Sequence, residues 1–327
     1  LTDYVEFEGF RITGGYGAGL RNDIDGTTGA VYRRNLIYDN RGAGANNPAG
    51  MYIHTCNDCI ISHNFLYDNG DAGGSQNNHQ IVAFRGTGTR FHHNRYWLSD
   101  AAGFVAEFSH CFKYKHSQAS LTATAESDRE IFINCNNGLS SGQAGHHIHD
   151  NIFLDSSDYA IRYLDQGGSF WPVNIVVERN TIIGSRPILT SWVRNNPNGV
   201  EDASEPGTFV WRQNVVRDTR ATEYPDDGSP VRYDHYGSDA DFTAVITGEL
   251  LTSNQNCYYN PNQEWEASVF GNNASTSLGA IYTTFAAWQA AGFETASFQE
   301  DPTIDATNEA TSVNCTSWGA RLVDADA

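Results

Sequence analysis

Hydrophobic and polar residues recur along most of the chain in short segments that share one pattern. Each segment has a few strand-forming residues, then Asn, then an apolar run and a polar turn, as in "ISHNFLYDN" and "VERNTIIGS". The shared residue occurs at Asn35, Asn64, Asn94, Asn151, Asn180 and Asn214, with spacings of 29, 30, 57, 29 and 34 residues. A repeat of this length indicates a solenoid.

Three further segments complete the series. The 57-residue gap has room for two repeats, and "SDREIFINC" supplies the missing one with Glu130 in the position of Asn. An early repeat, "VEFEGFRITGG", has Gly9 there, and a late one, "NQNCYYN", has Asn256. We therefore predict about eight or nine coils. Stacked Asn side chains at a bend can bond to neighbouring backbone groups, so we interpret this column as structural.

The residue types within each repeat indicate which solenoid it is. They are rich in Val, Ile, Tyr and Phe, are broken by Gly, Asn and Asp, and lack a helical period. We predict an all-β fold with a parallel β-helix at 1–260, in which each coil pairs with its neighbours. An Asp- and Gly-rich stretch at about 220–245 is predicted to be an inserted loop. Residues 261–327, with an amphipathic helix at about 283–291, are predicted to cap the open end.

Segments such as "CIISHNFLYDN" resemble the coils of right-handed parallel β-helix proteins of the pectate-lyase-like superfamily, which often stack Asn at a bend. The resemblance covers roughly residues 4–260 and implies a right-handed β-helix. It also implies a surface that acts on polysaccharides. The chain lacks the paired aspartates and "GHG" of polygalacturonases and the "RxPxxR" pattern of pectate lyases.

Charge limits the partners of this chain. It has 39 acidic and 20 basic residues and a net charge of -19. Broad attraction to nucleic acid or anionic membranes needs a basic face, so the charge argues against both as partners. No apolar run approaches the length of a membrane span. The acidic surface and the solenoid pattern predict a secreted or cell-surface protein, and a start within a predicted strand leads us to expect that upstream sequence has been removed.

Six cysteines in a chain of 327 residues are too few to indicate a fold held together mainly by disulfides. In "CNDC", Cys56 and Cys59 lack the second Cys or His pair that a zinc site of this spacing would need. A bridge and a pair of stacked thiols are both expected ahead of metal binding.

Lysine occurs only at Lys113 and Lys115, within "EFSHCFKYKHS", where His110 and His116 flank it. Strand side chains alternate between faces, so the two lysines share a face if this stretch is extended. Neighbouring like charges lower each other's proton affinity, which a role in solubility would not require. The stretch is therefore a candidate for chemistry.

The second strand of each repeat predicts a groove. Alternation directs His54, Glu107 and Arg162 outward, and corresponding residues of stacked coils lie about 4.8 Å apart. The predicted substrate-binding residues are His54, Arg85, Glu107 and His110.

The resemblance suggests a role for the lysines. β-Helix polysaccharide lyases neutralise a uronate carboxylate with a cation and remove the C5 proton with Lys, Arg, His or Tyr. The implied catalytic residues are Lys113, Lys115, His116 and Arg162, and the implied partner is an acidic polysaccharide. Alternatively, the lysines form surface salt bridges with Glu107, Glu126 or Asp128.

Two other functions are compatible with the sequence. A glycoside hydrolase would need two carboxylates on one face, for which Glu107, Asp165, Asp226 and Asp227 are available. A non-catalytic glycan-binding, adhesin or filament-type β-helix would use its Trp residues to stack on sugars.

No cofactor is required by these hypotheses, and calcium is the one metal the sequence suggests. Asp23 and Asp25, and separately Asp68 and Asp71, are closely spaced and lie next to Gly. Ordinary turn chemistry explains both groups equally well, because the full calcium-loop pattern is absent.

Overall fold

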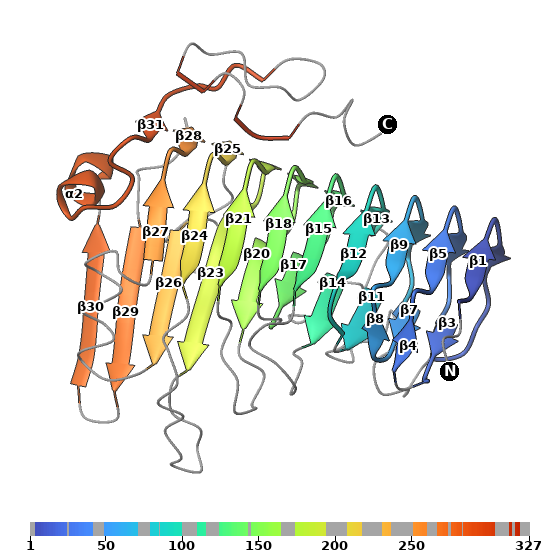
Figure 1. The fold of residues 1–327 in the computed structure, drawn as a ribbon. Helices are drawn as coiled ribbons and strands as arrows, with labels where there is room; N and C mark the ends of the chain where they lie inside the picture. The colour runs from blue at the N-terminus through green and yellow to red at the C-terminus, as the bar shows by residue number, and fades with distance from the viewer. Residues whose placement is uncertain are drawn as a thin grey trace.

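The computed structural model shows a parallel β-helix, in which three long sheets run along the axis of a solenoid (Figure 1). It describes residues 4–24, 26–41, 49–70, 79–84, 86–99, 110–115, 124–142, 145–164, 174–193, 208–217, 231–236, 251–259, 267–273, 276–282, 284–304, 314–315 and 318–320. Nine successive coils each give one strand to each long sheet. This confirms the predicted all-β solenoid and its number of coils.

The first strands of the coils form sheet A, seen along the upper front in Figure 1. Its strands are β1 (Glu6–Glu8), β5 (Val31–Arg33), β9 (Ile60–Ser62), β12 (Thr89–His92), β15 (Ala125–Asp128), β18 (His146–His149), β21 (Ile175–Glu178), β24 (Phe209–Arg212) and β27 (Leu251–Asn254). Neighbouring strands pair in parallel, coil on coil.

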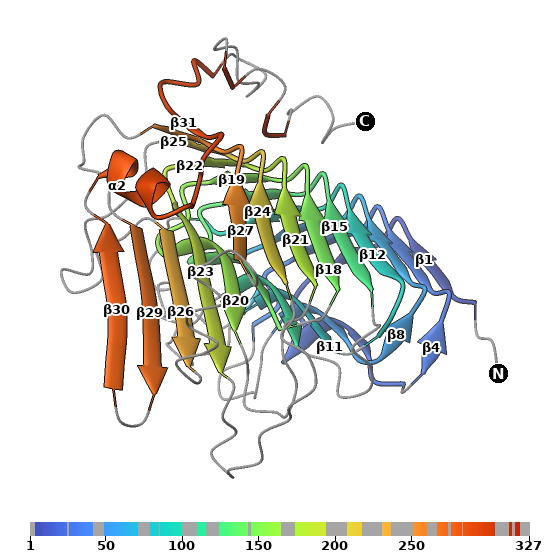
Figure 2. The same cartoon turned by 60° about the vertical axis from the view of Figure 1, so that its left-hand side comes forward.

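The second strands form sheet B, which Figure 2 shows along the upper edge of the solenoid. Its strands are β2 (Arg11–Ile12), β6 (Leu36–Tyr38), β10 (Phe65–Tyr67), β13 (Arg95–Trp97), β16 (Ile131–Ile133), β19 (Ile152–Leu154), β22 (Thr181–Ile183), β25 (Val215–Arg217), β28 (Cys257–Tyr259) and β31 (Phe298–Gln299). The last of these comes from the C-terminal region and extends the sheet beyond the ninth coil.

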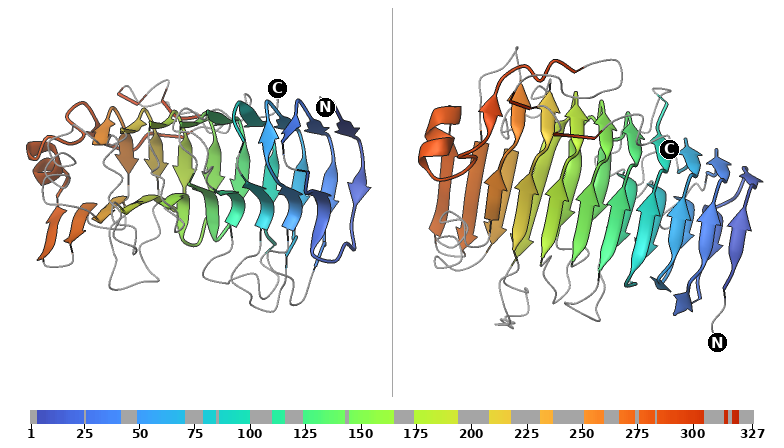
Figure 3. Two further views of the ribbon diagram at one scale, coloured as in Figure 1. Left: turned by 60° about the horizontal axis from the view of Figure 1, so that its bottom comes forward. Right: turned by 45° about the horizontal axis from the view of Figure 1, so that its top comes forward.

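The third strands form sheet C, and the stacking of all three sheets is visible from two further directions in Figure 3. Its strands are β3 (Ala18–Asn22), β7 (Ala49–Ile53), β11 (His79–Phe84), β14 (His110–Lys115), β17 (Asn137–Ser141), β20 (Tyr159–Leu164), β23 (Arg186–Val193), β26 (Val231–Tyr236), β29 (Ala267–Asn273) and β30 (Thr276–Tyr282). The pair β29–β30 is antiparallel. A small fourth sheet consists of β4 (Thr27–Thr28) and β8 (Cys56–Asn57).

The repeated Asn builds the corner between sheets A and B. In each rung the side chain of one coil bonds to the next, as when Asn64 Nδ2 donates to Asn94 Oδ1 at 2.9 Å and to the Tyr32 carbonyl at 2.9 Å. The residue before it has a positive φ, as at His63 with φ 55° and His93 with φ 57°. Because these bonds satisfy backbone groups at a sharp bend, they confirm the structural role of the Asn column.

Glu130 occupies one rung of this ladder, as the repeat spacing predicts. Its Oε1 accepts hydrogen bonds of 2.8 Å from Asn94 Nδ2 and of 2.8 Å from the Tyr96 hydroxyl. Its backbone N–H donates to Asn151 Oδ1 at 2.9 Å. Its Oε2 is buried and has no hydrogen-bond partner among the described residues. The fifth coil thus keeps the ladder with a carboxyl group in place of an amide.

Stacked aromatic rings fill the interior beside this ladder. Tyr96, Phe132 and Phe153 are fully buried, and their ring centroids are 4.7 and 4.5 Å apart in succession. Successive coils therefore repeat one packing arrangement, which is why the apolar pattern recurs at the coil length.

All six cysteines form disulfides. Of the two alternatives for "CNDC", the disulfide bridge is therefore the correct one. The disulfides are Cys56–Cys59, Cys111–Cys135 and Cys257–Cys315. The third joins β28 to the C-terminal segment, 58 residues further along the chain.

Two regions refine the predicted organisation. Val231–Tyr236, inside the stretch predicted as an inserted loop, forms β26 and pairs with β23. Its alternating "VRYDHY" fits a strand, and the Asp- and Gly-rich flanks obscured that in the sequence. The predicted C-terminal helix is confirmed as α2 (Phe285–Ala290), capped by the Thr284 side chain.

The C-terminal segment ends the ladder and then returns along sheet B. Glu294 is fully buried and accepts from Asn256 Nδ2 at 2.9 Å. Further on, the Ala320 N–H donates to Thr181 Oγ1 at 2.9 Å, and Ala320 packs against Ile131 and Ile152. This returning segment covers apolar outward residues of sheet B in the fifth and sixth coils.

Candidate functional site

The outer face of sheet C carries the lysine-containing strand. The register pairs Lys113 of β14 with Ser140 of β17, and Ser140 with Arg162 of β20. Lys113 and Arg162 therefore lie in one row, two coils apart, which corresponds to roughly 10 Å. Lys113 is 7 % exposed, and Lys115 lies two residues along the same strand, opposite Phe84.

Two other predicted binding residues lie around this row. His54 directly follows β7, and its ring centroid is 5.8 Å from that of Phe84. His110 has the same strand parity as the buried Phe112, is 2 % exposed and stacks on His79 at 5.4 Å. His54 is thus near the outward row, whereas His110 is buried against His79.

The remaining predicted residues lie outside the described part of the chain. They are Arg85, Glu107, His116, Asp25, Asp71, Asp165, Asp226 and Asp227, together with the side chain of Lys115. Of the other calcium candidates, Asp23 pairs with Arg21 at 2.5 Å, and Asp68 accepts from the Ser99 N–H at 2.7 Å. Calcium binding therefore stays a prediction.

The outer face of sheet A presents a second surface, which the sequence prediction did not include. In β12, β15 and β18 buried and outward residues alternate, so Arg90, Glu126 and His147 form one outward row. These side chains line an open hollow of about 330 Å³. His146, next to His147, points inward, is fully buried and lies 2.9 Å from the Ser127 hydroxyl. The row thus combines a cation, a carboxylate and an imidazole at one depression.

The adjacent outward row supplies ionic partners. Arg90 donates from Nε and Nη2 to the two carboxylate oxygens of the buried Asp128, each at 2.8 Å. His149 lies between two carboxylates, with Nε2 2.8 Å from Glu126 Oε1 and Nδ1 2.6 Å from Asp150 Oδ2. The face is therefore an ordered network of alternating charges.

Two arginines extend the network into the next coils. Arg179 donates two bonds of 3.0 Å to Asp150 and one of 2.5 Å to Glu178. Arg212 donates to the other oxygen of Glu178 at 2.7 Å, and His147 Nε2 lies 3.1 Å from Glu178 Oε1. Both acidic groups are thus held in place from two sides.

These surroundings separate the proton affinities of the two outward imidazoles. Burial, followed by the proximity of His149, lowers the pKa of His147. Burial also acts to lower the pKa of His149, but hydrogen bonds to Asp150 and Glu126 outweigh it and raise the pKa. For Asp150, bonds from His149 and Arg179 overcome the effect of burial and lower the pKa to about 2. At neutral pH this face pairs a neutral His147 with an ionised Asp150.

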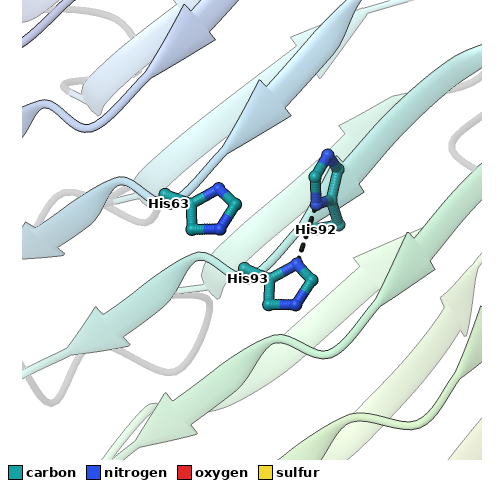
Figure 4. Close-up of side chains that lie close together, drawn as sticks. All are labelled: His63, His92 and His93. Atoms are coloured by element: carbon teal, nitrogen blue, oxygen red, sulfur yellow. Dashed lines mark hydrogen bonds between the residues drawn. The ribbon is translucent and has the colours of Figure 1, made fainter. Parts of the chain in front are cut away.

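A group of three histidines, His63, His92 and His93, lies at the corner where sheet A turns into sheet B (Figure 4). The Nδ1 atoms of His92 and His93 are 2.8 Å apart, and the rings of His63 and His93 stack with centroids 4.7 Å apart. Burial lowers the pKa of all three, that of His92 to about 4. The three imidazoles are therefore neutral at neutral pH.

A signal for the sheet A surface was present in the sequence. In "HHIHDN" His147 and His149 occupy alternating positions shortly before the Asn of the repeat, and in "RFHHN" His93 directly precedes that Asn. Alternation applied to the first strand of each coil, as well as to the second, would have placed His147 and His149 outward together.

Comparisons with known proteins give little further information. No known protein-family profile matches the chain, and no curated protein sequence does. Among solved structures, "The complex structure of XylC with xylose" is similar over 80% of this chain and 51% of that one, with 13% identity and a TM-score of 0.41. This chain therefore spans about half the length of that protein, and a likeness this distant carries no argument about activity.

No helix among the described residues has the length and apolar character needed to cross a membrane.

Proposed function

We propose that the protein cleaves an acidic polysaccharide by β-elimination on the outer face of sheet C. The observation that carries the proposal is the row Lys113–Ser140–Arg162, in which the register of three neighbouring strands aligns two cationic residues. Lys115 lies two residues further along the same strand. Both lysines of the chain, which has a net charge of -19, thus belong to one strand of this face.

The chemistry needs a base and a positive charge near a uronate. A neutral lysine amine takes the proton from C5, the C4–O4 bond breaks, and a double bond forms between C4 and C5 as the leaving oxygen gains a proton. The anion that develops next to the uronate carboxylate is stabilised by a fixed cation. Arg162 is always charged and can bind a carboxylate with two parallel hydrogen bonds, so we assign it that role.

The three disulfides support a secreted or cell-surface location as part of this proposal. Such bonds form and persist in oxidising compartments and are rare in the cytosol. Access to an extracellular polysaccharide would require the same location.

The test is turnover on a panel of uronate-containing and neutral polysaccharides, followed by the absorbance of the unsaturated product. Lys113→Met and Lys115→Met keep bulk and remove charge, and Arg162→Met removes the carboxylate partner. At least one lysine variant should lose more than about tenfold in rate with little change in melting temperature. Arg95→Met, on the exposed face of β13 in the same coil, is the matched control and should retain activity.

The same panel distinguishes cleavage from binding. A non-catalytic glycan-binding protein would change its mobility or melting temperature with a polysaccharide and yield no unsaturated product. A double Lys113→Met, Lys115→Met variant with the original rate would exclude the lysines from the site.

A further inference from the structure

We propose that Glu126, His147 and His149 bind a divalent transition-metal ion, such as Zn²⁺, on the outer face of sheet A. One potential ligand atom from each residue lies within 4.8 Å of the others. Zinc takes nitrogen and oxygen ligands at about 2.0–2.2 Å, so the ligand atoms of one tetrahedral ion lie about 3–4 Å apart. Small rotations of these side chains bring the three atoms to that spacing.

The position of His149 is the first argument for a cation here. Its two ring nitrogens face Glu126 Oε1 at 2.8 Å and Asp150 Oδ2 at 2.6 Å. A neutral imidazole has a single N–H, so it cannot donate to both carboxylates. Either a second proton or a metal ion must lie on the Nε2 side, and a metal there joins His149 to Glu126.

The second argument is that both imidazoles are already oriented by carboxylates. Asp150 accepts from the Nδ1 side of His149, and Glu178 lies 3.1 Å from His147 Nε2. Arg179 holds both of these carboxylates, at 3.0 and 2.5 Å. Metal-binding histidines usually donate their other N–H to a carboxylate in this way, which sets the tautomer and strengthens the ligand. The arrangement leaves His149 Nε2 and His147 Nδ1 for the ion.

The third argument is the composition and exposure of the site. Two imidazoles and one carboxylate favour zinc and its neighbours over calcium or magnesium, which prefer oxygen ligands. The side chains of His147 and Glu126 are 39% and 37% exposed, and both line the hollow of about 330 Å³. A fourth coordination position would open towards this hollow, which is typical of a reactive rather than a purely structural ion.

The His63, His92 and His93 group is a weaker metal site on the same face. Within the described part of the chain, none of its rings has a hydrogen bond to a carboxylate. The charges of Arg33 and Arg34 act on His63, and that of Arg129 acts on His93, each lowering the pKa of the imidazole. Arg179 likewise acts to lower the pKa of His147, but there the carboxylates of Glu126, Asp150 and Glu178 offset the positive charge. This group therefore serves as the internal comparison.

The experiment is a titration of chelator-treated protein with ZnCl₂ in a calorimeter, with Co²⁺ absorption spectra as a second readout. The full chain should bind a single equivalent of Zn²⁺, and Co²⁺ should give the intense visible bands of a four-coordinate ion. Glu126→Gln and His149→Gln should each weaken Zn²⁺ binding by at least about tenfold. His63→Gln, in the comparison group, should leave the affinity unchanged.

Circular dichroism verifies that each variant is folded, and Glu126→Gln, at a partly exposed position, decides the outcome if His149→Gln does not fold. No Zn²⁺ binding by the unaltered protein would overturn the proposal. So would unchanged affinity in Glu126→Gln, or a loss confined to His63→Gln. The test reads metal binding alone, so it is independent of the proposed polysaccharide cleavage.

Discussion

Replacing Glu130 by Gln should make the protein more stable at neutral pH, although it alters a native rung of the ladder. Glu130 is fully buried, and burial raises its pKa from 4.5 to about 8. The bonds from Asn94 and Tyr96 act in the opposite direction but do not offset burial. A neutral carboxyl group therefore occupies the fifth rung at pH 7.

The magnitude follows from the two pKa values. Below pH 4.5 the carboxyl group is protonated in both the folded and the unfolded chain, and its contribution to stability is fully present. Between pH 4.5 and about 8 only the unfolded chain releases the proton, so stability falls as pH rises. The loss is about 1.4 kcal/mol per pH unit, or about 3 kcal/mol at pH 7 and about 5 kcal/mol above pH 8.

Glu130→Gln removes this dependence because an amide does not titrate in this range. In the unaltered protein Glu130 Oε2 has no partner among the described residues. The Gln Nε2 that replaces this oxygen can donate to Asn151 Oδ1, just as the Asn side chains donate to the next Asn in other rungs. We expect the variant to exceed the unaltered protein by about 3 kcal/mol at pH 7 and to match it near pH 4.

Urea denaturation at a series of pH values from 4 to 9 measures the difference directly. The exposed Glu6→Gln is the matched control and should stay within about 0.5 kcal/mol at every pH. If Glu130→Gln and the unaltered protein lose stability in parallel as pH rises, Glu130 is ionised in the folded state and the reasoning is refuted.

Two further changes test what holds the coils together. Asn180→Ala removes the 3.0 Å bond to Asn214 and one of the two acceptors of the buried Asn151 Nδ2, so it should cost about 2–3 kcal/mol in urea denaturation. A change below about 0.5 kcal/mol would contradict the role of the ladder. The double variant Cys257→Ser, Cys315→Ser removes a link across 58 residues and should lower the free energy of unfolding by about 4 kcal/mol. Urea denaturation measures this loss in the variant and, as a check, in the unaltered protein under reducing conditions. Equal stability with and without reductant would disprove this contribution.

The sequence was sufficient to predict the coils because each coil repeats the same local demand. A side chain that hydrogen-bonds to the backbone is needed at the corner of every coil, so the number of repeated Asn positions gives the number of coils. Glu130 was recognised as the residue that takes this position in the coil without Asn. The register of Lys113 with Arg162 also follows from this count. The strand β26 was missed because the Asp- and Gly-rich residues on both sides of it made the whole stretch resemble a loop, although its own residues alternate as in a strand.

The surface of sheet A was harder to predict for a physical reason. Whether His149 meets Glu126 depends on side-chain rotation and on which coil lies next to which, and the two residues are 23 positions apart. Burial lowers the pKa of His147, whereas hydrogen bonds to Asp150 and Glu126 raise that of His149, so two residues of the same type on one strand differ in proton affinity. Alternation can place residues on a face, but it does not decide which of them bond.

The returning C-terminal segment changes how this solenoid should unfold. In a stack of repeats each coil contacts its neighbours only, so either end can fray one coil at a time. Here Gly319 bonds to Gln213 at 3.0 Å, Ala320 bonds to Thr181, and Ala320 packs against Ile131, while a disulfide ties the same segment to β28. Coils five to nine therefore share one long-range connection and should open together. The disulfide Cys111–Cys135 also links the fourth coil to the fifth. The first three coils keep the independence of an ordinary stack, which makes the N-terminal end the place where local opening begins.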